Sequence, residues 1–461
     1  MRREPVSFWQ GLLAGRSHLA FLGGLAIALG VAWTVSRVSP DDARQQRAEA
    51  RAGELLDLGA YLNVKNGAAI RPWGRALTAN EAAAAKSAWS YFERNTRPSG
   101  LVDSVEGFPA ATLWDLGSSL MAVIAAEQLG LIDHPALTRR AGDLVDALGK
   151  VPLLAAGVPN KSYDTRTLEM TDYGGNPSPR GIGWSSIDIA RFAVPLTILS
   201  WREPALTPRI RALLAKWDLD KLVSDGELVT GRITPEGSLQ LDQEGRLGYE
   251  QYAAESLSLL GLDTSRARLF RRHLGVVTAS GVRAPADDRA PEKHGGTTNG
   301  VTSDPFLLLA VEHGLESDWL PIAQAMLLAQ ERRAADTGQL TAVSEDHLDR
   351  PPHFVYFNVT EGGAAWVART PDGVDAANLR ALSTKAALGW GTIFASPYAD
   401  RLRAASLELV EPGKGFYSGR YEKESQPNRV LTANTNGIAL ELLAYGVHGP
   451  WLRAARREIS R

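Results

Sequence analysis

The stretch that decides the fold is LWDLGSSLMAVIAAEQLG (113–130), which is apolar on nearly every side. Its apolar spacing predicts a helix, and a helix that is hydrophobic all round is buried. The stretch ALTPRIRALLAKWDL (205–219) is of a second type, because charges occupy one of its sides. Such an amphipathic helix is expected at the outside of a domain.

Helices of these two types alternate along the chain. The apolar ones are expected at 112–130, 185–200, 248–261, 303–314, 380–395 and 432–446. The amphipathic ones are expected at 79–95, 135–149, 206–217, 264–274, 318–334 and 398–409. The alternation predicts six buried inner helices, each paired with an outer one.

Loop lengths alternate in the same way. Links from inner to outer helices are short, such as LIDH (131–134), whereas links from outer to inner helices are long, such as 150–184 and 335–379. Because short links join antiparallel neighbours, all long loops should share one end. We therefore expect an all-α (α/α)6 toroid with a cleft built by loops that hold short β-ribbons. A stack of helical repeats is the alternative, but no fixed period recurs.

Composition narrows the function classes. The 461 residues are 44% apolar and 22% charged, which is ordinary for a globular protein with a substantial core. A formal net charge of −2 gives no reason to expect a nucleic-acid partner. The lack of cysteine excludes disulfides, thiolate metal sites and a Cys nucleophile. No HExxH, GxGxxG or P-loop motif is present, so no metal or cofactor is expected.

The run LAFLGGLAIALGVAWTV (19–35) is about long enough to cross a bilayer. Three arginines precede it, and large domains translocate regardless of the charges near an anchor. We therefore expect a short cytoplasmic N-terminus at 1–18, an inner-membrane anchor at 19–36, a linker at 37–74 and a periplasmic domain at 75–461. A cleaved signal peptide is the alternative.

The loop-side start of each inner helix carries a polar motif. The six are TLWD (112–115), GWSSIDIAR (183–191), GYEQYAAES (248–256), TSDP (302–305), LSTKAALGW (382–390) and TANTNG (432–437). Helix capping and the helix dipole explain any one acid in such a place. They do not explain the whole set, because a buried carboxylate is costly unless it is paired.

Sugar cleavage needs two carboxyl groups across the glycosidic bond. Glu250 lies between Tyr249 and Tyr252, and its partly apolar surroundings should raise its pKa, so it is the expected proton donor. The predicted catalytic residues are Glu250, Glu345, Asp346 and Asp304. The predicted substrate-binding residues are Trp114, Asp115, Trp184, Asp188, Arg191, Tyr249, Tyr356, Lys385, Trp390, Glu422, Asn434 and Asn436. Their aromatic members should stack on sugar faces, and Asp188 is expected to pair with Arg191.

Several motifs together resemble one bacterial family, catalogued as domain of unknown function 3131. They are TLWDLGSSL (112–120), GWSSIDIARF (183–192), GYEQYAAESLSLLGLD (248–263), TGQLTAVSEDHLDRPPHFVYFNV (337–359), LSTKAALGWGTIFASPYA (382–399), SGRYE (418–422) and LTANTNGIALELLAY (431–445). The resemblance covers about residues 75–447. It implies an architecture similar to glucoamylase-like (α/α)6 enzymes, including β-1,2-glucanases, and work on an envelope polysaccharide.

Three functions compete. The first is a glycoside hydrolase or transglycosylase that acts on a β-glucan or exopolysaccharide. The second is a non-catalytic glycan-binding protein of a polysaccharide synthesis or secretion system. The third is a polysaccharide lyase using residues such as Tyr249, His294 and Asn299, which the acid-rich cleft disfavours because a lyase substrate is anionic.

Overall fold

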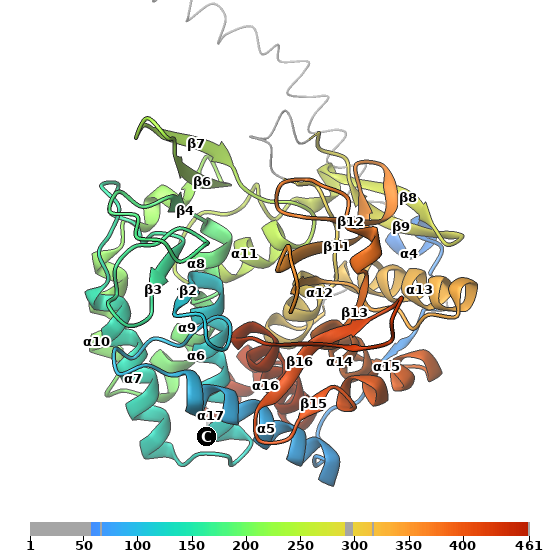
Figure 1. The fold of residues 1–461 in the computed structure, drawn as a ribbon, viewed down its shortest axis with the longest axis horizontal. Helices are drawn as coiled ribbons and strands as arrows, with labels where there is room; N and C mark the ends of the chain where they lie inside the picture. Colours follow the sequence, from blue (N-terminus) through green and yellow to red (C-terminus); the bar gives the residue numbers. More distant parts are fainter. Residues whose placement is uncertain (1–56, 65–66, 291–297, 316–317, 460–461) are drawn as a thin grey trace, which may run out of the picture. The chain divides into compact units, whose positions relative to one another are not determined.

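Six inner helical segments form a closed ring in the computed structural model of the protein (Figure 1). They are α6 (Leu113–Gln128), α8 (Ser186–Ala190) continued by α9 (Ala193–Arg202), α11 (Tyr249–Ser258), α12 (Asp304–Leu308) continued by the π-helical turn η4 (Leu309–His313), α14 (Thr384–Ile393) and α16 (Ala433–His448). Each contacts the next, and α16 contacts α6, which closes the ring. The predicted inner helices are confirmed.

The structure describes residues 57–64, 67–290, 298–315 and 318–459. The predicted anchor at 19–36 lies outside them, and no helix within them is long and apolar enough to cross a membrane. Residues 57–74, expected to belong to a linker, contain α4 (Leu58–Tyr61) and β1 (Ala69–Ile70). Strand β1 pairs with β14 (Phe394–Ala395), so this segment is attached to the ring domain.

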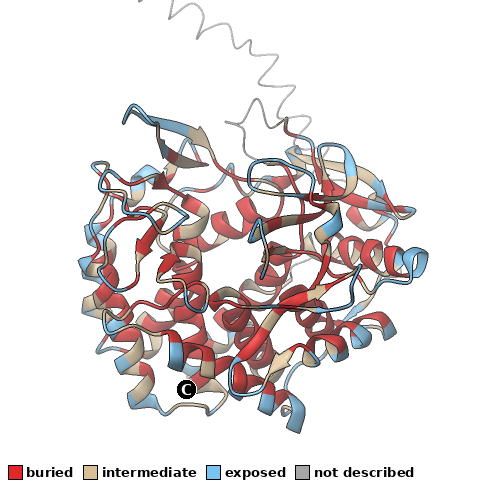
Figure 2. Cartoon of the chain, viewed as in Figure 1, coloured by how far each residue is buried: buried red, intermediate tan, exposed pale blue. Residues whose placement is uncertain are grey.

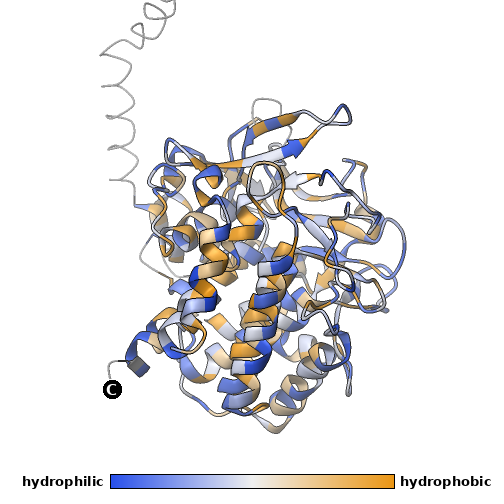
Figure 3. Cartoon of the chain, turned by 90° about the vertical axis from the view of Figure 1, so that its left-hand side faces the viewer, coloured by the Kyte–Doolittle hydropathy of each residue, from blue (hydrophilic) through white to orange (hydrophobic). Residues whose placement is uncertain are grey.

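Five of the six predicted outer helices are present. They are α5 (Ala79–Asn95), α7 (His134–Lys150), α10 (Thr207–Lys216), α13 (Trp319–Thr337) and α15 (Pro397–Leu407). Figure 3, seen from the side of α7 and α10, shows both hydrophilic and hydrophobic residues along the helices on that side. An additional helix, α17 (Trp451–Ile459), packs on α9, α16 and η4 and was not predicted.

The outer helix predicted at 264–274 is wrong. This segment forms turns, the 3₁₀ turn η2 (Phe270–Arg272) and the start of a hairpin, β8 (Leu274–Ala279) with β9 (Val282–Asp287). Arg266 and Arg272 both pair with Glu227, and Phe270 packs on Trp319. These contacts outweigh the weak local helix pattern, and the hairpin packs on α13 where an outer helix was expected.

Strand structure is more abundant than the all-α prediction allowed, and in this respect the prediction is wrong. The described residues hold six small sheets of two to four strands. Besides those named above, the strands are β2 (Ala110–Thr112), β3 (Ser162–Asp164), β4 (Gly183–Trp184), β5 (Val223–Ser224), β6 (Glu227–Ile233), β7 (Leu239–Gln243), β10 (Glu345–His347), β11 (Phe354–Glu361), β12 (Ala364–Arg369), β13 (Ala381–Ser383), β15 (Val410–Glu411), β16 (Gly415–Tyr421) and β17 (Pro427–Leu431). Strands β2, β4 and β13 run directly into α6, α8 and α14, so the sheets fix where inner helices begin.

The inner ring is buried along its length, and the exposed residues gather on the outer helices and loops (Figure 2). At its centre lies Arg191, which is fully buried between α8 and α9. Its guanidinium donates to Glu312 of η4 and, at 2.6 Å, to Glu441 of α16. The predicted pair of Asp188 with Arg191 is therefore wrong.

Arg191 also donates to Tyr252 of α11 at 3.1 Å and to Ser118 of α6 at 3.2 Å. Five of the six inner segments thus meet at one side chain. Gly117 makes room for it, since a Cβ there would lie 2.6 Å from Cγ of Arg191. Burial, together with Glu441, raises the pKa of Glu312 well above its ordinary value, although Arg191 opposes the shift.

The first prediction concerns this buried ionic cluster. Arg191→Met should lower the free energy of unfolding by roughly 3–5 kcal/mol, because it leaves two buried glutamates without their cation. Urea unfolding measures the loss. Arg420→Met is the matched control, since Arg420 forms an exposed pair with Glu408, and it should cost no more than about 1 kcal/mol. Equal midpoints for the two variants would contradict a central role for Arg191.

Candidate functional site

A cavity of 440 Å³ lies at the N-terminal ends of the inner helices, where the long loops gather. Its wall includes the first turns of α6, α8, α11, α12, α14 and α16. Ten of the sixteen predicted site residues line it: Asp304, Glu345, Asp346, Trp114, Asp115, Asp188, Tyr249, Tyr356, Lys385 and Asn434. The sequence therefore predicted that these residues gather at one cavity, although it did not select all of the lining residues.

Five predicted substrate-binding residues lie away from this cavity. Trp184 is buried and donates its indole N–H to the carbonyl of Val229, and its ring packs on Gly231. Trp390 is buried and donates to Ser303. The placement of both rings as sugar-stacking surfaces is wrong, because neither has a face open to the cavity.

The other three serve structural contacts. Glu422 accepts two hydrogen bonds from Arg333, at 2.6 and 2.8 Å. Asn436 is buried, and its side-chain oxygen accepts from the backbone N–H of Phe416 at 2.7 Å. Arg191 holds the ionic cluster at the centre of the ring. None of the three lines the cavity, so their predicted place in it is wrong.

Glu250, the expected proton donor, lies behind the cavity wall. Only 1% of its surface is exposed, and it accepts from Arg289 at 2.6 Å and from Gln243 at 3.0 Å. Gly245 stands between it and the cavity, since a Cβ on that glycine would lie 2.6 Å from Cβ of Glu250. Burial raises the pKa of Glu250 to about 7, as expected, but its placement in the cavity is wrong.

Asp188 is an acid of the first turn of α8 that does face the cavity. Ser185 caps this helix by accepting from the backbone N–H of Asp188 at 3.0 Å. Burial and then the nearby Glu244 raise the pKa of Asp188 to about 7, and Lys161 opposes them. Near neutral pH a large share of this carboxyl therefore keeps its proton, so it can act as an acid.

Glu244 explains part of this shift. It comes from the loop before α11 and accepts from the Ser185 hydroxyl at 2.7 Å and from the N–H groups of Ser186 and Ile187. A carboxylate suits the positive end of a helix, so Glu244 has a structural position. Its negative charge next to Asp188 favours the protonated form of that residue.

On the other side of the cavity, Lys385 of α14 organises three acids. Its buried ammonium donates to Asp304 and, at 2.7 Å, to the carbonyl of Glu345. Asp304 also accepts from Ser344 at 2.5 Å. The side chain of Glu345 pairs with Arg246. Asp304 and the Glu345 carboxylate are therefore both neutralised by cations.

Asp346 is different, although only 3% of its surface is exposed. Neither carboxylate oxygen has a hydrogen-bond partner among the described residues, and the Lys385 ammonium is 3.8 Å away. Burial raises the pKa of Asp346 to about 6, with Lys385 opposing the shift. A buried acceptor without a partner is costly, so this carboxylate is suited to receive hydrogen bonds from water or a ligand.

Aromatic rings form the rest of the wall. The edge of Trp114 packs on Tyr249 with ring centres 5.6 Å apart, and Tyr356 lies across from Glu345 on the neighbouring strand β11. Tyr173 was not predicted and is 60% exposed at the cavity. Such rings are suited to pack on sugar faces, which are largely apolar.

Three charged lining residues were also missed: Lys161, Glu244 and Arg246. Lys161 lies in PNKSYD (159–164), whose polar composition is a usable signal. Glu244 has no such signal, because its contacts with α8 join residues 57 to 59 positions apart. Acids outnumber cations in the lining, and no three described His, Asp or Glu side chains are placed to hold a metal ion.

Residues 83–449 match the family described as "Protein of unknown function (DUF3131)". The chain belongs to this family. No curated protein matches the sequence.

Several solved structures resemble the DUF3131 chain in fold. A glucoamylase-like protein from Bacteroides caccae has a TM-score of 0.59 at 13% identity, over 82% of this chain and 95% of its own. An endo-β-1,2-glucanase from Chitinophaga pinensis has 0.57 at 14% identity, over 83% and 98%. One from Talaromyces funiculosus has 0.53 at 9% identity, over 89% and 90%. At these identities the likeness establishes the helical toroid fold.

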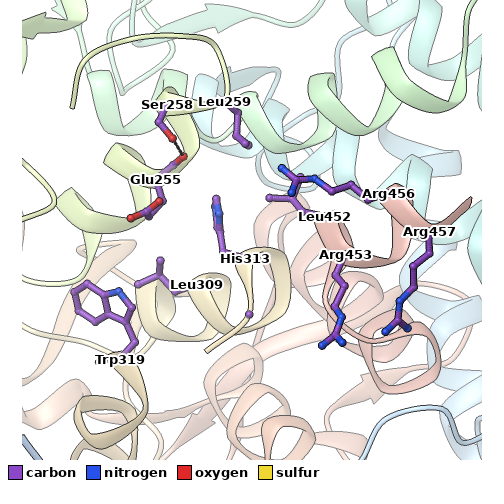
Figure 4. Close-up of a pocket in the computed structure, with 11 residues that line it drawn as sticks. Glu255, Ser258, Leu259, Leu309, His313, Trp319, Leu452, Arg453, Arg456 and Arg457 are labelled. Atoms are coloured by element: carbon purple, nitrogen blue, oxygen red, sulfur yellow. Dashed lines mark hydrogen bonds between the residues drawn. The ribbon is translucent and has the colours of Figure 1, made fainter. Parts of the chain in front are cut away.

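A larger hollow, of 760 Å³, lies at the C-terminal ends of the inner helices (Figure 4). Helix α17 contributes Arg453, Arg456 and Arg457 to it, and His313 projects into it from η4. Glu255 is the one acid among its described lining residues. It lacks a pair of carboxyls, so the DUF3131 cavity at the loop end is the better candidate for chemistry.

Proposed function

We propose that the DUF3131 chain is a glycoside hydrolase that cleaves a neutral glycan in the loop-end cavity. One observation carries the proposal: Asp188 and Asp346 both line this aromatic cavity, Asp188 has no ion pair among the described residues, and Asp346 has only the Lys385 ammonium 3.8 Å away and accepts no hydrogen bond. Asp188 belongs to α8, and Asp346 lies beside Lys385 of α14. These helices are three positions apart in the ring of six, so we infer that the two carboxyls lie on opposite sides of the cavity.

Their roles follow from their protonation. Asp188, with the higher pKa, gives its proton to the glycosidic oxygen as the bond from the anomeric carbon breaks. Asp346 is mostly ionised at neutral pH. It either takes a proton from the water that attacks the anomeric carbon or attacks this carbon itself. In the second case water then releases the sugar, so both routes consume one water for each bond.

The lining favours a neutral substrate. Six acids face three cations, and two of these cations are already paired with acids of the cavity. The resulting negative potential disfavours a uronate-rich polymer and therefore a lyase. β-1,2-Glucan is the first substrate to test, because the structures with a similar fold include endo-β-1,2-glucanases.

The second prediction is that the purified chain releases reducing ends from β-1,2-glucan or another neutral β-glucan of a linkage panel. Asp188→Asn and Asp346→Asn should each lower turnover by about a hundredfold or more, since each removes a proton-transfer group. Asp400→Asn is the control and should leave turnover unchanged, because Asp400 lies on the outer helix α15, where it forms an exposed ion pair with Arg71. Glycan binding without any release of reducing ends would favour the alternative, a glycan-binding protein of a synthesis or secretion system.

The third prediction concerns pH. Asp346 must be ionised, so kcat/KM should rise as pH increases through about 6. Asp188 must be protonated, so kcat/KM should fall as pH increases through about 7. The profile of the free enzyme is then a narrow bell. In Asp346→Asn the residual activity should lose its acid limb, and an unchanged acid limb would remove Asp346 from the mechanism.

We further propose that residues 19–36 anchor the chain in a bacterial inner membrane with the domain in the periplasm. The apolar run at 19–35 and the arginines before it support this placement. The fourth prediction is that the full chain sediments with membranes and resists carbonate extraction. Protease added to spheroplasts should digest the domain, and protection of the domain would contradict the orientation.

A further inference from the structure

Asn434 connects the cavity to the core of the ring. It lies in the first turn of α16, is half-buried and lines the cavity. Its side-chain oxygen accepts two hydrogen bonds, from the indole N–H of Trp114 at 3.0 Å and from the Ser118 hydroxyl at 3.1 Å. The side-chain nitrogen has no acceptor among the described residues.

The direction of these hydrogen bonds is fixed by chemistry. The Nε–H of Arg191 can only donate, so Ser118, 3.2 Å away, accepts from it. The Ser118 hydroxyl has one proton of its own, and it donates this proton to the Asn434 side-chain oxygen at 3.1 Å. The Trp114 indole N–H can also only donate. Rotating the amide of Asn434 by half a turn would set its NH₂ group against the indole N–H of Trp114, which cannot accept a hydrogen bond, and would remove the acceptor of the Ser118 proton.

The buried ionic cluster around Arg191 therefore determines whether the oxygen or the nitrogen of the Asn434 side chain is free. Glu312 and Glu441 hold the guanidinium of Arg191 in place, and Tyr252 adds a further contact. Trp114 is fixed by the same cluster, since its ring packs edge-on against Tyr252 at 5.9 Å. Because both donors occupy the amide oxygen, the NH₂ group is the part left for a ligand.

We propose that Arg191 and Ser118 orient Asn434 so that its side-chain NH₂ group donates a hydrogen bond to an acceptor oxygen of the bound glycan. Asn434 is then a substrate-binding residue, and Arg191 and Ser118 are positioning residues that act through it. The proposal rests on the proposed function, because it takes the ligand of the cavity to be a sugar. It does not depend on cleavage.

Binding to an inactive protein tests it. The parent is the full chain with Asp188→Asn, and the probe is a β-1,2-linked gluco-oligosaccharide titrated by calorimetry. Asn434→Asp keeps the oxygen that Trp114 and Ser118 contact but replaces the donor by an anionic acceptor. It should weaken binding about tenfold or more, the effect expected for one lost hydrogen bond together with a repelled oxygen.

Ser118→Ala tests positioning without touching the ligand. It removes one of the two donors that hold the amide oxygen and leaves Trp114 as the other, so the amide is held less firmly and binding should weaken by a smaller factor. Its unfolding midpoint shows whether the variant stays folded. Ser90→Ala is the matched control, because Ser90 donates to a backbone carbonyl of the outer helix α5 and should leave binding unchanged.

Side-chain amide signals in ¹H–¹⁵N NMR spectra provide a second readout. The Asn434 NH₂ signals should shift when the oligosaccharide is added to the parent and shift less in Ser118→Ala.

Equal affinity of the parent and Asn434→Asp for the oligosaccharide would overturn the inference and leave the proposed function intact. A parent that binds no oligosaccharide of the neutral linkage panel would overturn the proposed function and the inference with it. Binding that depends on Asn434 without cleavage in the wild type would support the inference alone.

Discussion

The buried guanidinium of Arg191 is the interaction on which the rest of the structure depends. Its two carboxylate partners lie 121 and 250 residues away in the chain, on η4 and α16. Only a closed ring of helices brings these groups together. Removing two carboxylates and a guanidinium from water is costly, so the cluster is stable only when all its hydrogen bonds are made. The closed ring in turn gathers the N-terminal ends of six inner segments around one cavity, and Ser118 and Asn434 link that cavity to the cluster.

The acids near the cavity are distinguished by their partners rather than by their pKa values. Burial raises the pKa of Glu250 to about 7, the same value as for Asp188, yet Glu250 is paired with Arg289 behind the cavity wall. Asp304 is held by Lys385, and Glu345 by Arg246. Asp346 and Asp188 remain available within the cavity. A raised pKa therefore indicates burial, and access to the cavity decides whether the proton can be used in chemistry.

Local sequence patterns predict the six inner helices, because a buried helix must be apolar on every side. Alternating loop lengths then placed Asp188, Asp346 and Lys385 in one cleft. The sequence did not predict which way individual side chains point or which residues pair across long stretches of the chain. Trp184 stands just before a helix as Trp114 stands at the start of one, and Trp390 lies about two turns into α14, but the rings of Trp184 and Trp390 are buried in the core. Arg266 and Arg272 pair with Glu227, and the segment that contains them forms turns where a helix was predicted. Because Glu227 lies about 40 residues away, the local pattern of this segment does not reveal these pairs.

The central claim is that Asp188 and Asp346 act on the two sides of one glycosidic bond. The most direct measurement is a crystal structure of Asp188→Asn with a bound β-1,2-gluco-oligosaccharide. The account predicts a glycosidic oxygen within hydrogen-bond distance of the residue 188 amide, roughly 2.6–3.2 Å, and an anomeric carbon facing Asp346. A sugar bound away from both positions, or in the hollow at the opposite end of the ring, would contradict it.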